Sequence, residues 1–237
     1  MSAYRRVLLK LSGEALAGAK GSGIDSGIVR SMAEEIVRVH ELGADFGVVI
    51  GAGNIVRGIS ASAEGGVRRE TGDQMGMLGT VINCLALRDA LRALGAKCAL
   101  FSGTEIGFCE RFSQARLDEA VAERRVVLFA GGTGNPYFTT DTAAALRALE
   151  FGADVLVKAT KVDGIYDSDP MKNPGARRFE KLTLDEAVAK DLKVMDAAAL
   201  ALCRDNKMPI LVCKMDEGNL EKAVRGEPVG TLVTPGE

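Results

Sequence analysis

The chain has 237 residues, 47% of them hydrophobic, which is enough for one large α/β domain or two small ones with a sizeable core. Its 30 basic and 32 acidic residues nearly cancel, so no strong positive field favours nucleic acid as a partner. No apolar run approaches the roughly 18 residues of a membrane span, and Lys10 interrupts an N-terminal apolar run that is too short for a signal peptide.

Strand patterns alternate with helix patterns along the chain. Continuous apolar runs predict buried strands at residues 6–11, 46–50, 98–101, 126–130, 155–158 and 210–213, with a last edge strand at 231–233. Helical periodicity and closing glycines predict helices at 28–42, roughly 73–94, 117–123, 141–151 and 195–205, and a polar loop covers 160–174. Apolar strands separated by helices predict an α/β fold, a three-layer αβα sandwich with a mainly parallel central sheet. We expect a single domain, 1–237, with two lobes.

The cysteines and the histidine indicate no metal or redox centre. The five cysteines form no CxxC pair and read as buried thiols in a reducing cytoplasm: Cys84, Cys98, Cys109, Cys203 and Cys213. The only histidine, His40, lies within a helical pattern, where a structural role is more common than a catalytic one. We therefore expect a cytoplasmic protein without a protein-held metal.

Three of the predicted strands end in glycine turns, at Gly13, at Gly51 and Gly53, and at Gly131 to Gly134. In open parallel sheets ligands bind outside the carboxyl ends of the strands, so these turns share one edge. Glycines let the backbone approach a ligand closely, and free N–H groups at a helix start attract phosphate. Several such turns on one edge predict an elongated ligand with more than one phosphate.

Familiar phosphate and nucleophile motifs are absent. The sequence contains no Gly-Lys dipeptide and hence no GxxxxGK[ST] loop, and the residues after Gly51-Ala52-Gly53 do not match GxGxxG. A GxSxG motif is absent, and one histidine supports no Ser-His-Asp arrangement.

Charged residues gather at the same sheet edge. Lys10 and Lys158 end buried strands, Lys161 follows closely, Arg57 lies just past a glycine turn, and Asp141 begins a helix. A buried lysine needs an anionic partner. Cations around glycine loops, with a carboxylate to hold them, predict a phosphoryl-transfer site.

A set of motifs resembles the amino acid kinase superfamily and, within it, the bacterial UMP kinases. The motifs are Lys10-Leu11-Ser12-Gly13-Glu14, Gly51-Ala52-Gly53-Asn54, Asp73-Gln74-Met75-Gly76-Met77, Gly132-Thr133-Gly134-Asn135-Pro136, Thr139-Thr140-Asp141, Lys158 to Tyr166 and Lys193-Val194-Met195-Asp196. The similarity runs nearly end to end, and the combination is specific although each motif alone is weak.

The resemblance implies the amino acid kinase fold, with an acceptor-binding lobe at about 1–150 and an ATP-binding lobe at about 151–237. It implies transfer of the ATP γ-phosphoryl group to UMP, with Mg²⁺ carried by ATP, in pyrimidine biosynthesis. It places on ATP the residues Lys10, Leu11, Ser12, Gly13, Gly53, Arg57, Thr160, Tyr166 and Asp169. It places on UMP the residues Ala52, Asp73, Thr133, Gly134, Asn135, Pro136, Tyr137, Phe138, Thr139 and Thr140, with Asp73 accepting from ribose hydroxyls.

The expected chemistry needs charge neutralisation rather than a base. A phosphate monoester has a second pKa near 6 and is largely ionised at neutral pH. Lys10, with Lys158 or Lys193, would neutralise the γ-phosphoryl oxygens, and Asp141 would orient the lysines. The resemblance also implies a homohexamer, a trimer of dimers, with UTP as inhibitor and GTP as activator at the loop Gly18, Ala19, Lys20, Gly21, Ser22 and Gly23, which has no apolar anchor.

One helix and one residue have more than one possible packing. The helix from Met75 to Leu94 has apolar residues on more than one face, which predicts either a dimer contact or a helix thoroughly buried in the monomer. The family usually has glycine where Ala52 stands. If this position needs only a small residue rather than positive φ, alanine is tolerated, and we expect that outcome.

Two alternatives remain. A related kinase of the family would act on an amino acid or on carbamate, although the motif at Asp73 fits a ribose-bearing acceptor better. Molybdate or tungstate storage proteins on the same fold bind oxyanions without a phosphoryl acceptor. Lys10, Asp141 and the threonine-rich acceptor segment favour the enzyme. A DNA-bound role has no support beyond ordinary surface arginines.

Overall fold

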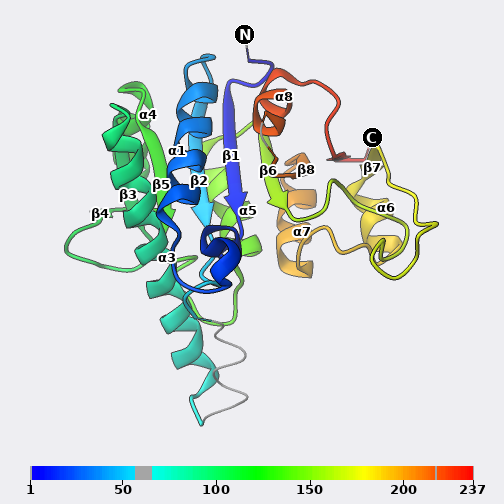
Figure 1. The fold of residues 1–237 in the computed structure, drawn as a ribbon, viewed down its shortest axis with the longest axis horizontal. Coiled ribbons are helices and arrows are strands. Elements are labelled where there is room, and N and C mark those ends of the chain that lie inside the picture. The colour runs from blue at the N-terminus through cyan, green and yellow to red at the C-terminus, as the bar shows by residue number, and fades with distance from the viewer. Residues whose placement is uncertain (1, 57–65, 217, 237) are drawn as a thin grey trace.

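A computed structural model describes residues 2–56, 66–216 and 218–236, and its centre is one nine-stranded sheet (Figure 1). The sheet order is β4-β3-β5-β2-β1-β6-β8-β9-β7, and every pairing is parallel except β8 with β9. The strands are β1 (Arg6–Leu11), β2 (Asp45–Ile50), β3 (Cys98–Ser102), β4 (Glu110–Arg111), β5 (Val126–Ala130), β6 (Val155–Thr160), β7 (Lys181–Thr183), β8 (Ile210–Lys214) and β9 (Thr231–Thr234).

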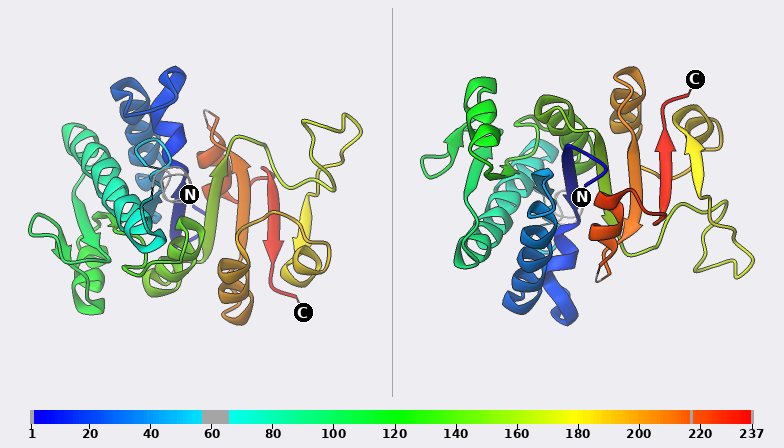
Figure 2. Two further views of the ribbon diagram at one scale, coloured as in Figure 1. Left: turned by 90° about the horizontal axis from the view of Figure 1, so that it is seen from below. Right: turned by 90° about the horizontal axis from the view of Figure 1, so that it is seen from above.

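Helices cover both faces of the sheet and complete the predicted three layers (Figure 2). One face packs against α1 (Ser26–His40), α3 (Arg69–Ala93) and α8 (Asn219–Arg225). The other face packs against α4 (Gln114–Ala122), α5 (Thr140–Phe151), α6 (Leu184–Ala189) and α7 (Ala197–Asp205). A 3₁₀ helix, η1 (Gly13–Lys20), follows β1.

Both faces of the sheet are buried, and this explains why the strands are unbroken apolar runs in the sequence. Successive side chains of a strand point to opposite faces, and each face meets a hydrophobic core. Along β1, Leu9 faces the core beneath α1 and α3, whereas Leu8 faces the core beneath α5. Both side chains are fully buried, because a parallel sheet covered on two faces has no wet side. The predicted α/β sandwich is therefore confirmed.

The C-terminal third differs from the prediction. The expected edge strand at 231–233 is wrong, because β9 lies between β8 and β7, and β7 forms the edge. The elements β4, β7, α6 and α8 were not predicted, since strands of two or three residues show no readable alternation. A capping box between Thr183 and Glu186 marks the start of α6.

The long helix α3 begins at Arg69, four residues before the predicted start at Asp73. Its buried side includes Met77, Val81 and Cys84, but Leu78 and Ile82 are 56% and 45% exposed. A helix thoroughly buried in the monomer is therefore excluded. Among the helices within the described ranges, none is long and apolar enough to cross a bilayer.

Candidate active site

The carboxyl ends of β1, β2 and β5 meet at one edge of the sheet, where the glycine turns converge. The turns after β1 and β2 touch closely: a Cβ atom on Gly13 would lie 2.4 Å from the carbonyl oxygen of Gly51. Only glycine fits there, because no real Cβ atom approaches backbone so closely. This packing brings the end of β1 against the turn that carries Ala52 and Gly53.

Two lysines and one aspartate form the electrostatic centre of this edge. Lys10 and Lys158 are register partners on the adjacent strands β1 and β6. Asp141, in the first turn of α5, bridges them, with its Oδ1 at 2.7 Å from the Lys10 Nζ and its Oδ2 at 2.8 Å from the Lys158 Nζ. The Lys158 amine also donates to the carbonyl oxygen of Val194 at 2.6 Å. The predicted grouping of Lys10, Asp141 and Lys158 is thus present.

Burial and charge oppose each other in this triad. Burial alone raises the pKa of Asp141, but attraction to Lys10 and Lys158 outweighs it and leaves the pKa below its ordinary value of 3.8. Burial lowers the pKa of Lys158 from 10.5, and the neighbouring positive charge of Lys10 adds to this, whereas Asp141 partly restores it. Within the triad two cations face one carboxylate, and Asp196 also raises the pKa of Lys158, so it is the two amines rather than an excess of charge that suit an anionic ligand.

Threonine hydroxyls fix the start of α5 by hydrogen bonds within the helix and to Asp196 at the start of α7. The Thr139 hydroxyl accepts from the backbone N–H of Asp141 at 3.0 Å and donates to Asp196. The Thr142 hydroxyl also donates to Asp196, at 3.0 and 3.1 Å from its two carboxylate oxygens, and Asp196 caps α7 by accepting from the N–H of Ala199 at 2.8 Å. Asp196 was part of a recognised motif but was not predicted as a site residue. Its place at the start of a helix was the available signal.

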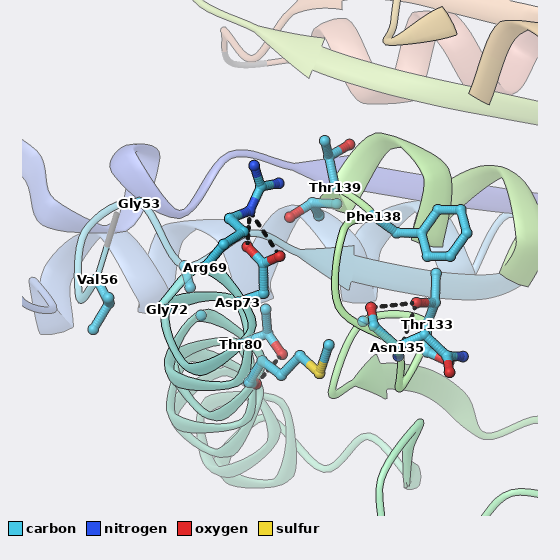
Figure 3. A pocket seen from close by; sticks show the side chains of 15 residues that line it. Gly53, Val56, Arg69, Gly72, Asp73, Thr80, Thr133, Asn135, Phe138 and Thr139 are labelled. Atoms are coloured by element: carbon cyan, nitrogen blue, oxygen red, sulfur yellow. Dashed lines mark hydrogen bonds and ion pairs between the residues drawn. The ribbon is translucent and has the colours of Figure 1, made fainter. Parts of the chain in front are cut away.

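A cavity of about 210 Å³ opens beside this centre, between the start of α3 and the segment before α5 (Figure 3). It is lined by many of the residues predicted to bind the acceptor, namely Ala52, Asp73, Thr133, Asn135, Phe138, Thr139 and Thr140. Gly53, predicted on the ATP side, also lines it, as do the unpredicted Val56, Arg69, Gly72, Gly76, Met77, Thr80 and Gly132. The structure therefore gathers the predicted acceptor positions around one hollow.

Arg69 lines one side of this cavity, whereas Tyr137 does not line it but binds the same carboxylate, that of Asp73. The Arg69 Nε donates to both carboxylate oxygens of Asp73, at 2.8 and 3.0 Å, as the dashed lines in Figure 3 show. The backbone N–H of Tyr137 donates to Asp73 Oδ2 at 2.8 Å, and the Tyr137 hydroxyl donates to Glu70 at 2.5 Å. Tyr137 has φ of 71°, a conformation that side chains rarely adopt. Arg69 was missed, although its spacing of four residues from Asp73 on a helix could have indicated the pair.

Gly134 and Pro136 do not line the cavity but belong to the same loop. Asn135 N–H donates to the Thr133 hydroxyl at 3.1 Å, so the loop forms a tight turn that holds both side chains beside the hollow.

The residues predicted on ATP are more dispersed. Leu11 is buried, and Ser12 precedes η1 without a side-chain capping bond. Thr160 ends β6, the strand of Lys158, and its hydroxyl donates to the carbonyl oxygen of Val162 at 2.6 Å. Tyr166 donates to Asp163 at 2.7 Å in the following loop, and Asp169 accepts from the N–H of Met171 there. Arg57 lies outside the described residues.

An ion pair with Asp141 distinguishes Lys158 from Lys193, the two candidates for the second catalytic lysine. Within the described part of the chain, Lys10 and Lys158 form ion pairs with Asp141, and Lys193 does not. Lys193 precedes Val194, whose carbonyl accepts from Lys158, so it lies on the same turn without joining the triad.

The segment from Gly18 to Gly23 overlaps the end of η1, and polar contacts rather than an apolar anchor tie its far end. Gly23 N–H donates to the carbonyl oxygen of Asn54 at 2.9 Å, and the Asn54 amide donates to the carbonyl oxygen of Gly23 at 2.7 Å. Asn54 itself is buried, so the loop is attached to the glycine turn after β2.

Ala52 fits because a glycine faces it. Its φ is not positive: the described non-glycine residues with positive φ are Arg124, Tyr137, Asp191 and Lys207. A Cβ atom on Gly79 of α3 would lie 2.8 Å from the Ala52 methyl group. The position therefore requires a small residue rather than a special backbone conformation, and α3 leaves the space for the methyl.

The fold and the lysine–aspartate centre define a phosphotransferase class. Residues 5–214 match the model of the amino acid kinase family, and the chain belongs to that family. A uridylate kinase from Methylococcus capsulatus is 51% identical over 235 residues, 98% of each chain, and one from Yersinia enterocolitica is 51% identical over 233 residues, 98% of this chain and 94% of the relative.

A crystal structure of UMP kinase from Bacillus anthracis superposes with a TM-score of 0.95 at 36% identity, over 99% of this chain and 97% of that one. Within the amino acid kinase family, the chain belongs to the uridylate kinases.

Proposed function

We propose that the protein transfers the γ-phosphoryl group of ATP to UMP, giving ADP and UDP, as a step of pyrimidine nucleotide biosynthesis. The proposal rests on one observation: the cavity and the lysine–aspartate centre lie next to each other. Thr139 and Thr140 line the cavity, and the next residue, Asp141, holds Lys10 and Lys158. An acceptor in the cavity would therefore lie beside the cationic centre.

The reaction needs no general base in this proposal, because the UMP phosphate is largely ionised at neutral pH. Its difficulty is the approach of two anions. Lys10 and Lys158 neutralise the oxygens of the transferred group, and Asp141 holds both amines in place before the substrates arrive. Asp73 accepts from the ribose hydroxyls after exchanging its contacts with Arg69 and Tyr137.

Mg²⁺ belongs to this proposal as a companion of ATP. Among the described residues, no cluster of three or more His, Cys, Asp or Glu side chains could hold a metal ion. Mg²⁺ is commonly bound through substrate phosphates with few protein ligands, and in this proposal it accompanies ATP. When bound, it would supply positive charge beside the phosphate oxygens, as the lysines do.

We propose an acceptor-binding lobe at about 1–150 and an ATP-binding lobe at about 151–237, and the latter includes Thr160, Tyr166 and Asp169. The five cysteines are free thiols, which supports the proposed cytoplasmic location. For assembly, we propose a homohexamer in which the exposed Leu78 and Ile82 of α3 form a dimer contact.

We propose GTP as an activator that binds at the loop from Gly18 to Gly23, and UTP as an inhibitor. The bonds between Gly23 and Asn54 support a path from this loop to the glycine turn that carries Gly53.

The test is an initial-rate assay of ADP release with ATP·Mg²⁺ and separate acceptors: UMP, CMP, dCMP, glutamate and carbamate. We expect UMP to be preferred, with GTP raising the rate and UTP lowering it. Preference for CMP or for a carboxylate acceptor would overturn the proposal. Purified protein that carries molybdenum and shows no UMP-dependent ADP release would favour oxyanion storage instead.

A further inference from the structure

Arg147, on α5, is a buried cation that the proposed chemistry does not use. Its side chain is only 5% exposed, in a helix that is otherwise rich in alanine. A buried charge requires partners, and Arg147 has a carboxylate on one side, with its Nη1 at 2.5 Å from Glu150 Oε2. Its guanidinium also lies 4.7 Å from the ring centre of Phe112 and 6.0 Å from that of Phe129.

The third contact of Arg147 reaches the acceptor cavity. Its Nη2 donates to the carbonyl oxygen of Gly132 at 3.2 Å, and Gly132 lines the cavity next to Thr133. The guanidinium thus connects the middle of α5 with the loop that precedes this helix.

Few side chains hold this loop: within it, the N–H of Gly134 donates to the carbonyl oxygen of Gly131 at 3.0 Å, and its backbone packs against Gly103. Gly131, Gly132 and Gly134 all have positive φ, at 70°, 59° and 82°, and glycines have no side chains with which to pack. On the α3 side, the N–H of Gly131 donates to the Thr80 hydroxyl at 2.8 Å. On the α5 side, the contact comes from Arg147. Beyond its own turn, the loop is therefore held to α3 by one hydroxyl and to α5 by one guanidinium.

The geometry requires arginine rather than any cation. The planar fork reaches Glu150 with one terminal nitrogen and Gly132 with the other, while its flat face packs on aromatic rings. Its Nε is buried without a hydrogen-bond partner among the described residues. An unsatisfied buried donor is unfavourable, so the two terminal contacts and the aromatic faces determine how the group is oriented.

We propose that Arg147 is a positioning residue for the acceptor: it holds the Gly132 carbonyl so that Thr133 and Asn135 face the nucleobase before it binds. The inference rests on the proposed function, because it assumes that the cavity receives UMP. It predicts an effect on one substrate only, since the described contacts of Arg147 are with Glu150, Phe112, Phe129 and Gly132, none of which was predicted on ATP.

The experiment compares Arg147→Lys with Glu150→Gln in steady-state assays that vary UMP and ATP separately. Lysine keeps the charge but cannot form both contacts, so we expect the KM for UMP to rise roughly tenfold to a hundredfold, the range for a hydrogen bond to a charged group, while the KM for ATP changes less than about twofold. Glu150→Gln keeps the Gly132 contact and serves as the matched control, with both KM values near wild type.

The inference would be overturned if the wild-type enzyme phosphorylates UMP but Arg147→Lys leaves the KM for UMP unchanged. It would also be overturned if this variant shifts the KM for UMP and the KM for ATP equally. The same holds if Glu150→Gln reproduces the effect of Arg147→Lys. A wild-type enzyme without UMP kinase activity would instead overturn the proposed function. If Arg147→Lys does not fold, Phe112→Leu decides: it removes the aromatic face, and a selective rise in the KM for UMP supports the inference, whereas no rise refutes it.

Discussion

The packing of Gly79 against Ala52 allows a quantitative test of how the acceptor cavity is built. In Gly79→Ala, the new methyl would lie 2.8 Å from that of Ala52, against an ordinary contact of 3.4–4 Å. Ala52 would have to move by roughly 0.6 to 1.2 Å. Overpacking of this kind costs ~1–3 kcal/mol. Replacing glycine inside a helix returns about 1 kcal/mol, so we expect a net loss of stability of about 1 kcal/mol.

The double variant Ala52→Gly/Gly79→Ala restores the space and isolates the clash. We expect its stability and its KM for UMP to return to near wild-type values, whereas Gly79→Ala alone raises that KM because the cavity wall has moved. Urea unfolding, followed by far-UV circular dichroism, measures the stability of the wild type, the two single variants and the double variant. The coupling free energy between positions 52 and 79 should exceed about 1 kcal/mol.

Gly76→Ala provides the matched control for helix propensity. A Cβ atom on Gly76, three residues earlier on the same helix, meets nothing within 4 Å, so this variant should gain up to about 1 kcal/mol in stability. A coupling below about 0.5 kcal/mol between positions 52 and 79 would mean that the two residues are independent, and the argument for their mutual fit would fail.

Three further variants test the cationic centre and its support. Lys10→Ala should lower kcat by at least ~100-fold while the thermal unfolding midpoint stays close to wild type, and near-normal turnover would remove Lys10 from the chemistry. Asp141→Asn should destabilise the fold by about 3 kcal/mol at neutral pH. Because the folded-state pKa of Asp141 is depressed, its stabilisation is present above the ordinary value of 3.8 and is lost as the pH falls below it, so thermal melts of wild type and Asp141→Asn should converge in acid. A constant gap between the two from about pH 7 to about pH 3 would contradict this. Asp196→Ala removes a helix cap and the acceptor of two threonine hydroxyls, and should lower the unfolding free energy by about 2 kcal/mol in urea titrations. An unchanged urea midpoint would show that the contacts of Asp196 add no stability.

The central fold was predictable because the buried strands are continuous apolar runs and three of them are followed by glycine turns. β1, β2 and β5 carry this signal, and their parallel arrangement alone places Lys10 near the residues after β5. The position of β9 was not predictable in the same way, because it depends on β7, a three-residue strand that begins with an exposed lysine.

Site residues were predictable from the sequence where the chemistry requires an unusual residue type at its position. They were not predictable where residues of a common type hold the site in place. Asp141 stood out as an acid at a helix start, next to hydroxyl residues. Arg147 resembled any surface arginine of a helix, since its burial depends on Phe112 and Phe129, which arrive from other parts of the chain. The bridging of Lys10 and Lys158 likewise depends on a pairing between residues far apart in sequence.

The position of β1 at the middle of the sheet has a consequence for the order of folding. Its neighbours are β2, which follows within the first 50 residues, and β6, which begins at residue 155. While the chain is being synthesised, one edge of β1 stays unpaired until β6 emerges, and an unpaired apolar edge is prone to aggregation. The lysine pair comes into existence only when β6 docks. Recovery of activity after refolding therefore requires this long-range pairing at the sheet centre, which loop-closure entropy makes slow relative to local contacts.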